Sequence, residues 1–276
     1  MITGNVIING VDIKSTYGAY VIEGGFVDIP CIPDMKEPTV NDWYEYDGFE
    51  ADLDSPCCEP LTHTIVFMMK GELSVLYSFL KMIRSERLIS INMVDISREI
   101  NARVVSAIPK GIAIGMYRIS VDLCEDNPLE GIEYIVPDNQ SRPTGLIIDG
   151  NDISLYGMSL VDSIDWLYPG VDVKDNLLHS SQYDNGESHF TGNDMSVTCN
   201  ADDIEISAVM KSKSFHQFWI KRNALALDLF KPGERVITYK GVSKKAYYKS
   251  CRSSLFMYSD RIWWKFELSF GNLGGE

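Results

Sequence analysis

The sequence of 276 residues is poor in the patterns from which catalytic and metal sites are built. Its four histidines and six cysteines stand at no metal-ligand spacing. The glycine-rich loops that hold nucleotides and the Gly-x-Ser-x-Gly turn of hydrolases are absent from it as well. We therefore expect no catalytic residue, no metal ligand and no cofactor.

Long apolar runs are also lacking. No run approaches the roughly 18 apolar residues that a helix needs to cross a bilayer, so we expect no insertion into a membrane. The first residues, Met-Ile-Thr-Gly-Asn, have neither the basic nor the apolar segment of a signal peptide. We expect a protein that is made in the cytosol with reduced thiols and is not secreted through a signal peptide.

Basic side chains are in the minority, with 25 Lys and Arg against 39 Asp and Glu, which gives a net charge of −14. Affinity for nucleic acids comes largely from neutralising phosphates with Lys and Arg. This balance argues against sequence-specific binding of nucleic acid.

The charges are unevenly spread, with acidic residues gathered between 42 and 54 and basic residues between 231 and 252. Such runs usually form solvated surfaces. Alternatively, the acidic loop of one chain docks on the basic hairpin of another. The candidate inter-subunit charges are Asp47, Glu50, Asp52, Lys240, Lys244 and Lys245.

A short phrase occurs twice in the chain, about 140 residues apart. Residues 7–13 read Ile-Ile-Asn-Gly-Val-Asp-Ile, and residues 147–153 read Ile-Ile-Asp-Gly-Asn-Asp-Ile. A Tyr-Gly pair follows each phrase, at Tyr17-Gly18 and Tyr156-Gly157. Since a period of this length is that of a whole domain, the chain is predicted to hold one fold twice.

Four further landmarks follow each phrase in the same order. They are a strand-like run ending in Met-Lys, a short helical pattern, an apolar strand, and a strict alternation of apolar and polar residues. We expect Trp219 and Trp264 to lie on core faces. The matching segments are 65–70 and 204–211, 73–80 and 215–219, 88–93 and 225–230, and 117–123 and 264–270.

These landmarks predict a mainly β protein of two tandem β-sandwich or barrel-like domains, each with one short α-helix. The first domain is expected at 1–127 and the second at 147–276, joined by a linker at 128–146 that holds three prolines. A single large β protein with accidental internal similarity is the alternative. The dipeptides Asn9-Gly10 and Asp149-Gly150 favour a tight hairpin turn with positive φ.

Segments 8–13 and 17–21 resemble the opening of the distal tail (Dit) and tail-tube-like proteins of long-tailed bacteriophages. The similarity continues through the irregular loop at 40–54, the strand at 64–70 and the closing residues 125–128. The positions that carry the motif in the two copies are Asn9, Gly10, Asp12, Tyr17 and Gly18, and Asp149, Gly150, Asp152, Tyr156 and Gly157.

The resemblance implies a tail-tube-type β fold that acts as a non-catalytic structural component of a phage or prophage tail tip or baseplate. Such proteins form rings and stack on neighbouring tail proteins. Three chains with two domains each would present six similar units around one axis, so we favour a homotrimer with pseudo-sixfold symmetry; a hexamer is the alternative. The protein would be made in the bacterial cytoplasm and incorporated into a virion or tail-like particle.

Two other functions stay open. The first is a carbohydrate- or receptor-binding module in which the loop-rich segment 162–203 of the second domain presents the site, with Trp166 as a candidate contact. Trp43 and Trp263 are further candidates for stacking on a sugar. The second is an enzyme that acts on the cell wall, which would need a placed pair of carboxylates. Acidic pairs such as Glu50 with Asp52 are expected by coincidence among 39 acids.

Overall fold

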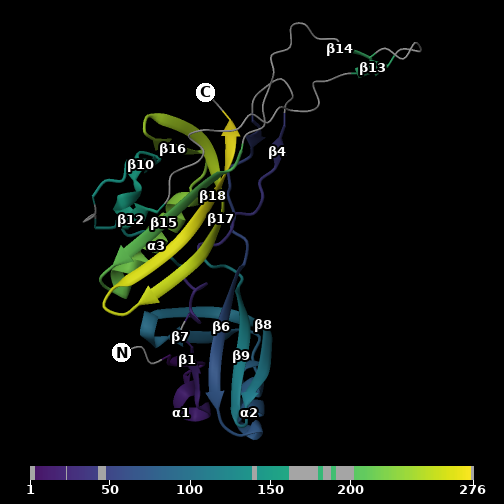
Figure 1. The fold of residues 1–276 in the computed structure, drawn as a ribbon, viewed down its shortest axis with the longest axis vertical. Helices are drawn as coiled ribbons and strands as arrows, with labels where there is room; N and C mark the ends of the chain where they lie inside the picture. Colours follow the sequence, from purple (N-terminus) through teal and green to yellow (C-terminus); the bar gives the residue numbers. More distant parts are fainter. Residues whose placement is uncertain are drawn as a thin grey trace.

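A computed structural model of the chain shows two seven-stranded antiparallel sheets, one beyond the other along the long axis (Figure 1). The predicted mainly β fold is confirmed. The structure describes residues 4–22, 24–42, 48–138, 142–161, 180–182, 188–190 and 202–274.

The first sheet has the strand order β2-β1-β7-β8-β9-β6-β3. The helical segments that accompany it are α1 (Ile13–Tyr17), α2 (Leu73–Ile83) and the 3-10 turn η1 (Val94–Ile96). Its strands are β1 (Val6–Ile8), β2 (Val11–Asp12), β3 (Ala19–Val21), β6 (Leu61–Lys70), β7 (Ile89–Met93), β8 (Arg98–Ala113) and β9 (Met116–Glu125).

The second sheet has the order β11-β10-β16-β17-β18-β15-β12. The 3-10 turn η2 (Ile153–Tyr156) and the helix α3 (Phe215–Leu229) belong to it. Its strands are β10 (Leu146–Ile148), β11 (Asn151–Asp152), β12 (Met158–Leu160), β15 (Ile204–Ser212), β16 (Arg235–Tyr239), β17 (Val242–Tyr258) and β18 (Ile262–Gly274). Two small pairs stand apart, β4 (Val40–Asn41) with β5 (Glu50–Ala51) and β13 (Ser180–Gln182) with β14 (Ser188–Phe190).

Strands taken in chain order occupy the same places in both sheets, so the two sheets are two copies of one topology. We call them, with their helices, the first and the second repeat. The last strand of the first sheet ends at Glu125 and the next begins at Leu146. Leu146, expected at the end of the linker, is therefore already part of the second sheet. The connecting segment crosses from one sheet to the other without a strand in its described residues, 126–138 and 142–145.

The repeated phrase forms the same hairpin in both repeats. Asn9 and Gly10 have φ of 49° and 78°, and Asp149 and Gly150 have φ of 49° and 82°. Two successive residues with positive φ match the right-handed twist of the strands that they connect. The turn is pinned to the neighbouring strand by the side chain that opens it, since Ser90 N donates to Asn9 Oδ1 (2.8 Å) and Val236 N donates to Asp149 Oδ1 (2.7 Å).

The next-to-last residue of each phrase, an aspartate, caps the helical turn that follows it. Asp12 Oδ1 accepts the backbone N–H groups of Lys14 (2.9 Å) and Ser15 (3.0 Å), and Asp152 Oδ1 accepts that of Ser154 (2.8 Å). The bond from the Ser15 amide lowers the pKa of Asp12. These contacts satisfy amides that have no partner within their own turn.

The Tyr-Gly pair and the Met-Lys run, two separate landmarks of the sequence, meet in the structure. Lys70 N donates to Gly18 O (3.3 Å), and Lys211 N donates to Gly157 O (3.1 Å). A Cβ on Gly18 would lie 2.7 Å from Lys70 O, and the φ of Gly18 is +68°. Glycine is therefore required here both by conformation and by the close approach of the next strand.

Each repeat packs one long helix on its own sheet. Phe79 of α2 lies against Phe67 with ring centroids 5.9 Å apart, and Phe218 of α3 lies against Trp264 at 6.0 Å. The predicted alternation on the closing strands is confirmed, because Ile119 and Val121 and the matching Phe266 are buried. The predicted core positions of Trp219 and Trp264 are confirmed as well.

The expected apolar strand at 225–230 is wrong, because residues 215–229 form the single helix α3. Leu225, Leu227 and Leu229 alternate with the small Ala226 and the polar Asp228, and this pattern resembles that of a strand. Ala and Leu have high helix propensity, however, and the buried residues Phe218, Arg222, Leu225 and Leu229 stand at spacings of four, three and four. The matching strand of the second repeat is β16, six residues beyond the helix. The expected single helix per repeat also needs correction, since the first repeat has the short α1 besides α2.

Substitution of Gly18 tests the packing of the repeated motif. We expect Gly18→Ala to lower the free energy of unfolding by more than about 2 kcal/mol, since it adds a clash with Lys70 O to the cost of positive φ. Gly10→Ala is the matched control: its φ is +78°, but its Cβ would meet nothing within 4 Å, so about 1 kcal/mol is expected. Urea unfolding of both variants measures the difference, and equal losses would contradict the role of the close approach.

Candidate functional site

The most distinctive site lies where the two repeats meet. Residues 24–42 and 48–59, which we call the strap, lie between β3 and β6 in the chain and run along the second sheet (Figure 1). Three backbone hydrogen bonds hold the strap there: Met35 N to Lys249 O (2.8 Å), Gly233 N to Leu53 O (2.9 Å) and Phe49 N to Leu273 O (3.3 Å).

Arg222 of α3 is the polar centre of the junction. Its side chain is buried, its Nε donates to Pro30 O (3.0 Å), and a terminal nitrogen donates to Cys31 O. Removal from water, together with the charge of Arg98, lowers the pKa of Arg222 to about 10. Carbonyl oxygens of the strap thus hold the guanidinium. In return, Arg222 provides hydrogen-bond donors to carbonyls that are not paired in a strand.

Trp219, one helical turn before Arg222, joins α3 to the first repeat itself. Its indole Nε1 donates to Ile96 O (2.8 Å), which lies between β7 and β8. The guanidinium of Arg98 lies 5.1 Å from the centroid of the Trp219 ring. Burial lowers the pKa of Arg98, and the nearby carboxylate of Glu125 opposes this shift. An aromatic residue that has a buried N–H donor and a cation over its face is well suited to fix the relative orientation of two units.

The strap is also anchored at the base of the first sheet. His63 of β6 is buried, with its Nε2 at 2.5 Å from Glu125 Oε1 and its Nδ1 at 3.2 Å from Asp28 O. The pair therefore ties together β6, β9 and the start of the strap. Both ring nitrogens of His63 thus have a partner inside the chain, which is the pattern of a packed junction.

Two buried thiols face each other where the strap crosses β17. A hydrogen bond between Cys251 and Cys31 lowers the pKa of Cys31, whereas burial raises that of Cys251. Cys251 N also donates to Asp34 Oδ1 (3.3 Å), and Tyr248 Oη donates to Ile32 O (3.4 Å). The strap thus replaces a partner strand along part of the β17 edge, where β16 no longer reaches.

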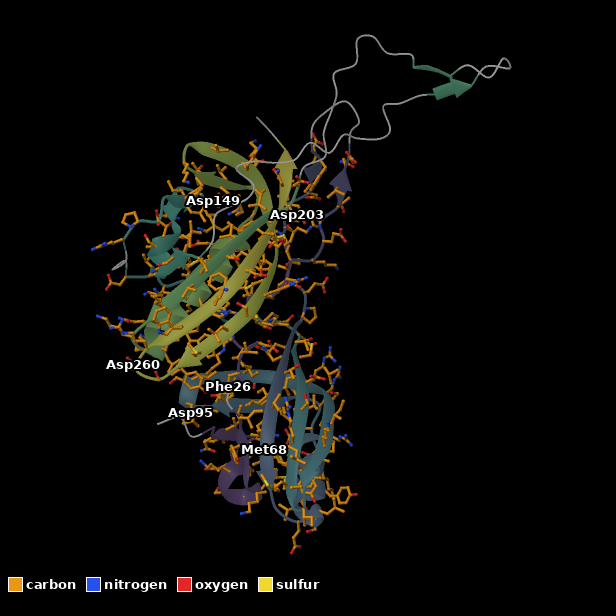
Figure 2. All side chains as sticks on the ribbon, viewed as in Figure 1. Phe26, Met68, Asp95, Asp149, Asp203 and Asp260 are labelled. Carbon is orange, nitrogen blue, oxygen red and sulfur yellow. The ribbon has the colours of Figure 1, made fainter. Side chains whose placement is uncertain are left out.

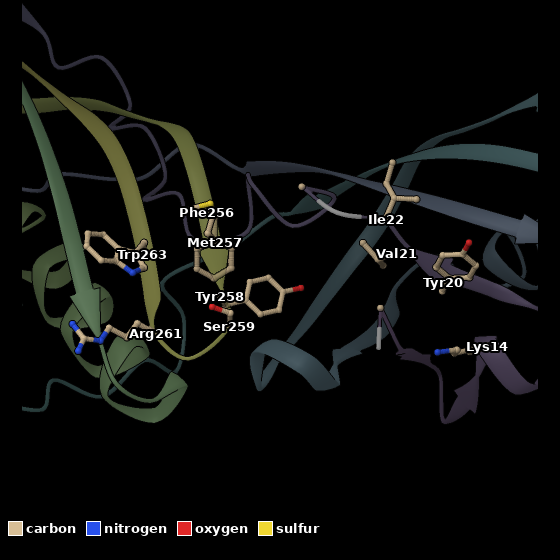
Figure 3. A pocket seen from close by; sticks show the side chains of 12 residues that line it. Lys14, Tyr20, Val21, Ile22, Phe256, Met257, Tyr258, Ser259, Arg261 and Trp263 are labelled. Carbon is tan, nitrogen blue, oxygen red and sulfur yellow. The ribbon is translucent and has the colours of Figure 1, made fainter. Parts of the chain in front are cut away.

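A cleft of about 820 Å³ opens beside the junction (Figure 3). The first repeat contributes the edge strand β3, and the second contributes the turn between β17 and β18. Figure 2 marks Phe26 at the boundary between the sheets and Asp260 in that turn. The lining residues are Gly4, Lys14, Tyr20, Val21, Ile22, Gly24, Phe256, Met257, Tyr258, Ser259, Arg261 and Trp263.

The chemistry of the cleft suits binding better than a reaction. Among the described lining residues, the charged groups are the cations Lys14 and Arg261, and the other side chains are apolar or aromatic apart from Ser259. Lys211 Nζ lies 4.3 Å from the centroid of the Trp263 ring and covers one face of it. General acid-base catalysis needs a positioned proton acceptor, and the residues of this lining that the structure describes, which exclude position 23, include no carboxylate or histidine.

Of the predicted inter-subunit charges that the structure describes, Glu50, Lys244 and Lys245 lie on strands. Lys240 lies in the turn between β16 and β17, and Asp52 directly follows β5. Glu50 is in β5, and the neighbouring Phe49 packs on Tyr247 of β17 with ring centroids 6.2 Å apart. Lys245 forms an ion pair with Glu234 (2.7 Å), and Lys240 lies over the Tyr239 ring at 5.2 Å. Lys244 is paired with Ile237 in the β16–β17 ladder, and Asp52 N donates to Thr39 O (2.9 Å).

Several predicted residues lie outside the described part of the chain. These are Asp47, Trp43, Trp166 and most of the segment 162–203. Among the described residues, no group of three or more His, Cys, Asp or Glu is arranged to hold a metal ion. No helix in that part of the chain is long and apolar enough to span a membrane.

The residues that build the junction could not be singled out from the sequence. Arg222 and Arg98 interrupt otherwise apolar or alternating segments, which is a weak signal of a buried cation. The strap has no periodic pattern, and its contacts are made mainly by backbone carbonyls.

A comparison of the chain with known protein families and with curated proteins finds no match.

Substitution of Arg222 tests the junction. We expect Arg222→Ala to lower the free energy of unfolding by about 3 kcal/mol, because two buried carbonyl oxygens lose a charged donor. Arg222→Lys should recover less than half of the loss, since one ammonium cannot reproduce the planar fork. Urea unfolding gives both values, with the exposed Lys213→Ala on the approach to α3 as control. A loss below about 1 kcal/mol for Arg222→Ala would show that the strap is held without this residue.

Proposed function

We propose that this chain is a non-catalytic structural component of a phage or prophage tail tip, which assembles with its own copies into a ring. The observation that carries the proposal is the head-to-tail contact between two copies of one topology. The helix side of the second repeat contacts the η1 side of the first repeat, so two different faces meet. The helix side of the first repeat and the corresponding η1 side of the second repeat have no such counterpart inside the described chain. Contacts of this heterologous kind generate rings when the rotation closes.

The resemblance of residues 8–13 and 17–21 to distal tail and tail-tube-like proteins gives the ring its biological setting. The two copies of the motif form matching turns, caps and glycine contacts, which fits a duplicated unit of that family. His63, Glu125 and Arg222 of the junction are buried and hydrogen-bonded within the chain, which fits an architectural role. Three chains would supply six such units, and stacking on neighbouring tail proteins would use the flat sides of the ring.

Assembly mass tests this function directly. We expect the purified chain, at protein concentrations up to the millimolar range, to give the mass of three copies of 31.1 kDa by light scattering after size exclusion. Negative-stain images should then show closed rings with six similar lobes. Six copies would favour a ring with the second repeat on the outside, and a single copy at every concentration would contradict the proposal.

The cleft favours a second candidate function, the binding of a glycan or another receptor group. Trp263, Tyr20 and Met257 offer apolar surface there, and Arg261 and Lys14 offer donors to hydroxyl or acidic groups. Sugar recognition commonly combines an aromatic face with such donors. The ring and the cleft are compatible, because the cleft lies inside one chain.

Loss of the Trp263 ring tests the second candidate. On a glycan array, we expect wild-type binding that falls at least tenfold in Trp263→Ala, because the variant removes the largest apolar surface of the cleft. Met257→Ala, at the same cleft, should cause a smaller loss, and Val136→Ala, on the exposed connection between the repeats, should cause none. Absence of any glycan signal from the wild-type chain would remove this candidate and leave the ring untouched.

A further inference from the structure

The junction inside the chain provides a template for a contact between chains. Within the chain, α3 and the β17–β18 hairpin of the second repeat face the β3 and η1 side of the first repeat. We call the first surface the helix-and-hairpin face and the second the edge face. Because both repeats share one topology, each repeat has a version of both faces.

The helix-and-hairpin face is covered in the second repeat and exposed in the first. Tyr77 and Trp219 are both the fifth residue of their helices; Trp219 is 7% exposed, whereas Tyr77 is 62% exposed. At the hairpin of the first repeat, Ile112 is 54% exposed, and the neighbouring Ile114 is fully exposed. An apolar surface of this kind is uncommon on a protein that stays monomeric.

The counterpart of that surface is the edge face of the second repeat. Within the chain, Ile22 lines the cleft opposite the β17–β18 turn, and Arg98 lies over Trp219. Val161 holds the place of Ile22, since Ile22 N donates to Val66 O and Val161 N to Ser207 O, both at 3.1 Å. Val242 holds the place of Arg98, because each is the first residue of its strand and pairs with the last residue of the strand before it.

Both residues at the corresponding places of the second repeat are apolar, whereas one of the two in the in-chain junction, Arg98, is charged. Val161 is 43% exposed and Val242 is 39% exposed, and both lie where the template puts the hairpin and the helix of a neighbour. Tyr77 replaces Trp219, and Leu80 stands at the place of Arg222, since each is the eighth residue of its helix. Leu80 is buried in the first repeat, so the exposed apolar surface there consists of Tyr77, Ile112 and Ile114, and its proposed counterparts are Val161 and Val242.

We infer that the helix-and-hairpin face of the first repeat, around Tyr77 and Ile112, docks on the edge face of the second repeat, around Val161 and Val242, of another copy of this chain. The contact between chains then repeats the contact within the chain. The inference rests on the proposed ring and names the surfaces that close it. Other partners fit less well. A second copy presents an edge face of the same topology as the one that the helix-and-hairpin face already contacts within the chain.

Opposite-face variants test this inference. Tyr77→Glu breaks the helix-and-hairpin face and Val161→Glu breaks the edge face, and both side chains are exposed enough for the chain to fold. We expect each variant alone to fall from the mass of three chains to that of one. An equimolar mixture should give a dimer and nothing larger, because one intact face of each kind remains. Ile112→Glu, as a second variant of the first face, should behave like Tyr77→Glu.

The control is Val136→Glu, which places the same charge on a residue that is 72% exposed in the connection between the repeats. It should keep the wild-type mass, and circular dichroism should show all variants folded. Rings that persist in Tyr77→Glu and Ile112→Glu would overturn the assigned faces while leaving the ring intact. If Tyr77→Glu and Val161→Glu are each monomeric but their equimolar mixture forms no dimer, the head-to-tail pairing would be overturned. A wild-type chain that stays monomeric would overturn both the proposed function and this contact.

Discussion

The junction depends on one buried cation. Arg222 is removed from water between two layers, and a guanidinium in that position is tolerated only when oxygen atoms surround it. The strap supplies those oxygens from its own backbone, at Pro30 and Cys31. The course of a segment with little regular structure is therefore fixed by a residue nearly two hundred positions away. The position of α3, the edge of β17 and the orientation of the two sheets follow from this arrangement.

Duplication explains why the two repeats look alike and why they differ. The turns, caps and glycine contacts of the repeated motif are the same in both, since they serve the fold of each sheet by itself. Positions that face the other repeat have diverged instead. Arg222 stands where the first repeat has Leu80, and Trp219 stands where it has Tyr77. A pair of equal units joined head to tail must diverge at these places, because one copy of each face becomes internal and the other does not.

Regular elements of this chain could be predicted well where periodicity is local. Alternation gave β9 and β18, and the Asn-Gly and Asp-Gly pairs gave the hairpin turns. The prediction of a strand at 225–230 was wrong, because leucines at every second position from 225 to 229 resemble a strand, whereas Ala224 and Ala226 favour a helix. Only the burial of residues at spacings of three and four decides between the two. The course of the strap could not be predicted, since its contacts with Arg222 are made by backbone carbonyls, which every residue type has. The exposure of Tyr77 could not be predicted, because helical spacing of apolar residues shows that a side chain is apolar and not which molecule covers it.

The path of the strap has a consequence for how the chain folds during synthesis. Its residues leave the ribosome within the first quarter of the chain, but the strands on which they lie, β17 and β18, are made last. Contacts with so large a separation in sequence form late and slowly. The first sheet can pair its own strands early, while Pro30, Cys31 and Met35 wait for partners near the C-terminus. The junction can therefore close only after β17 has been made, and a chain that stops before β17 would carry a strap without these hydrogen-bond partners.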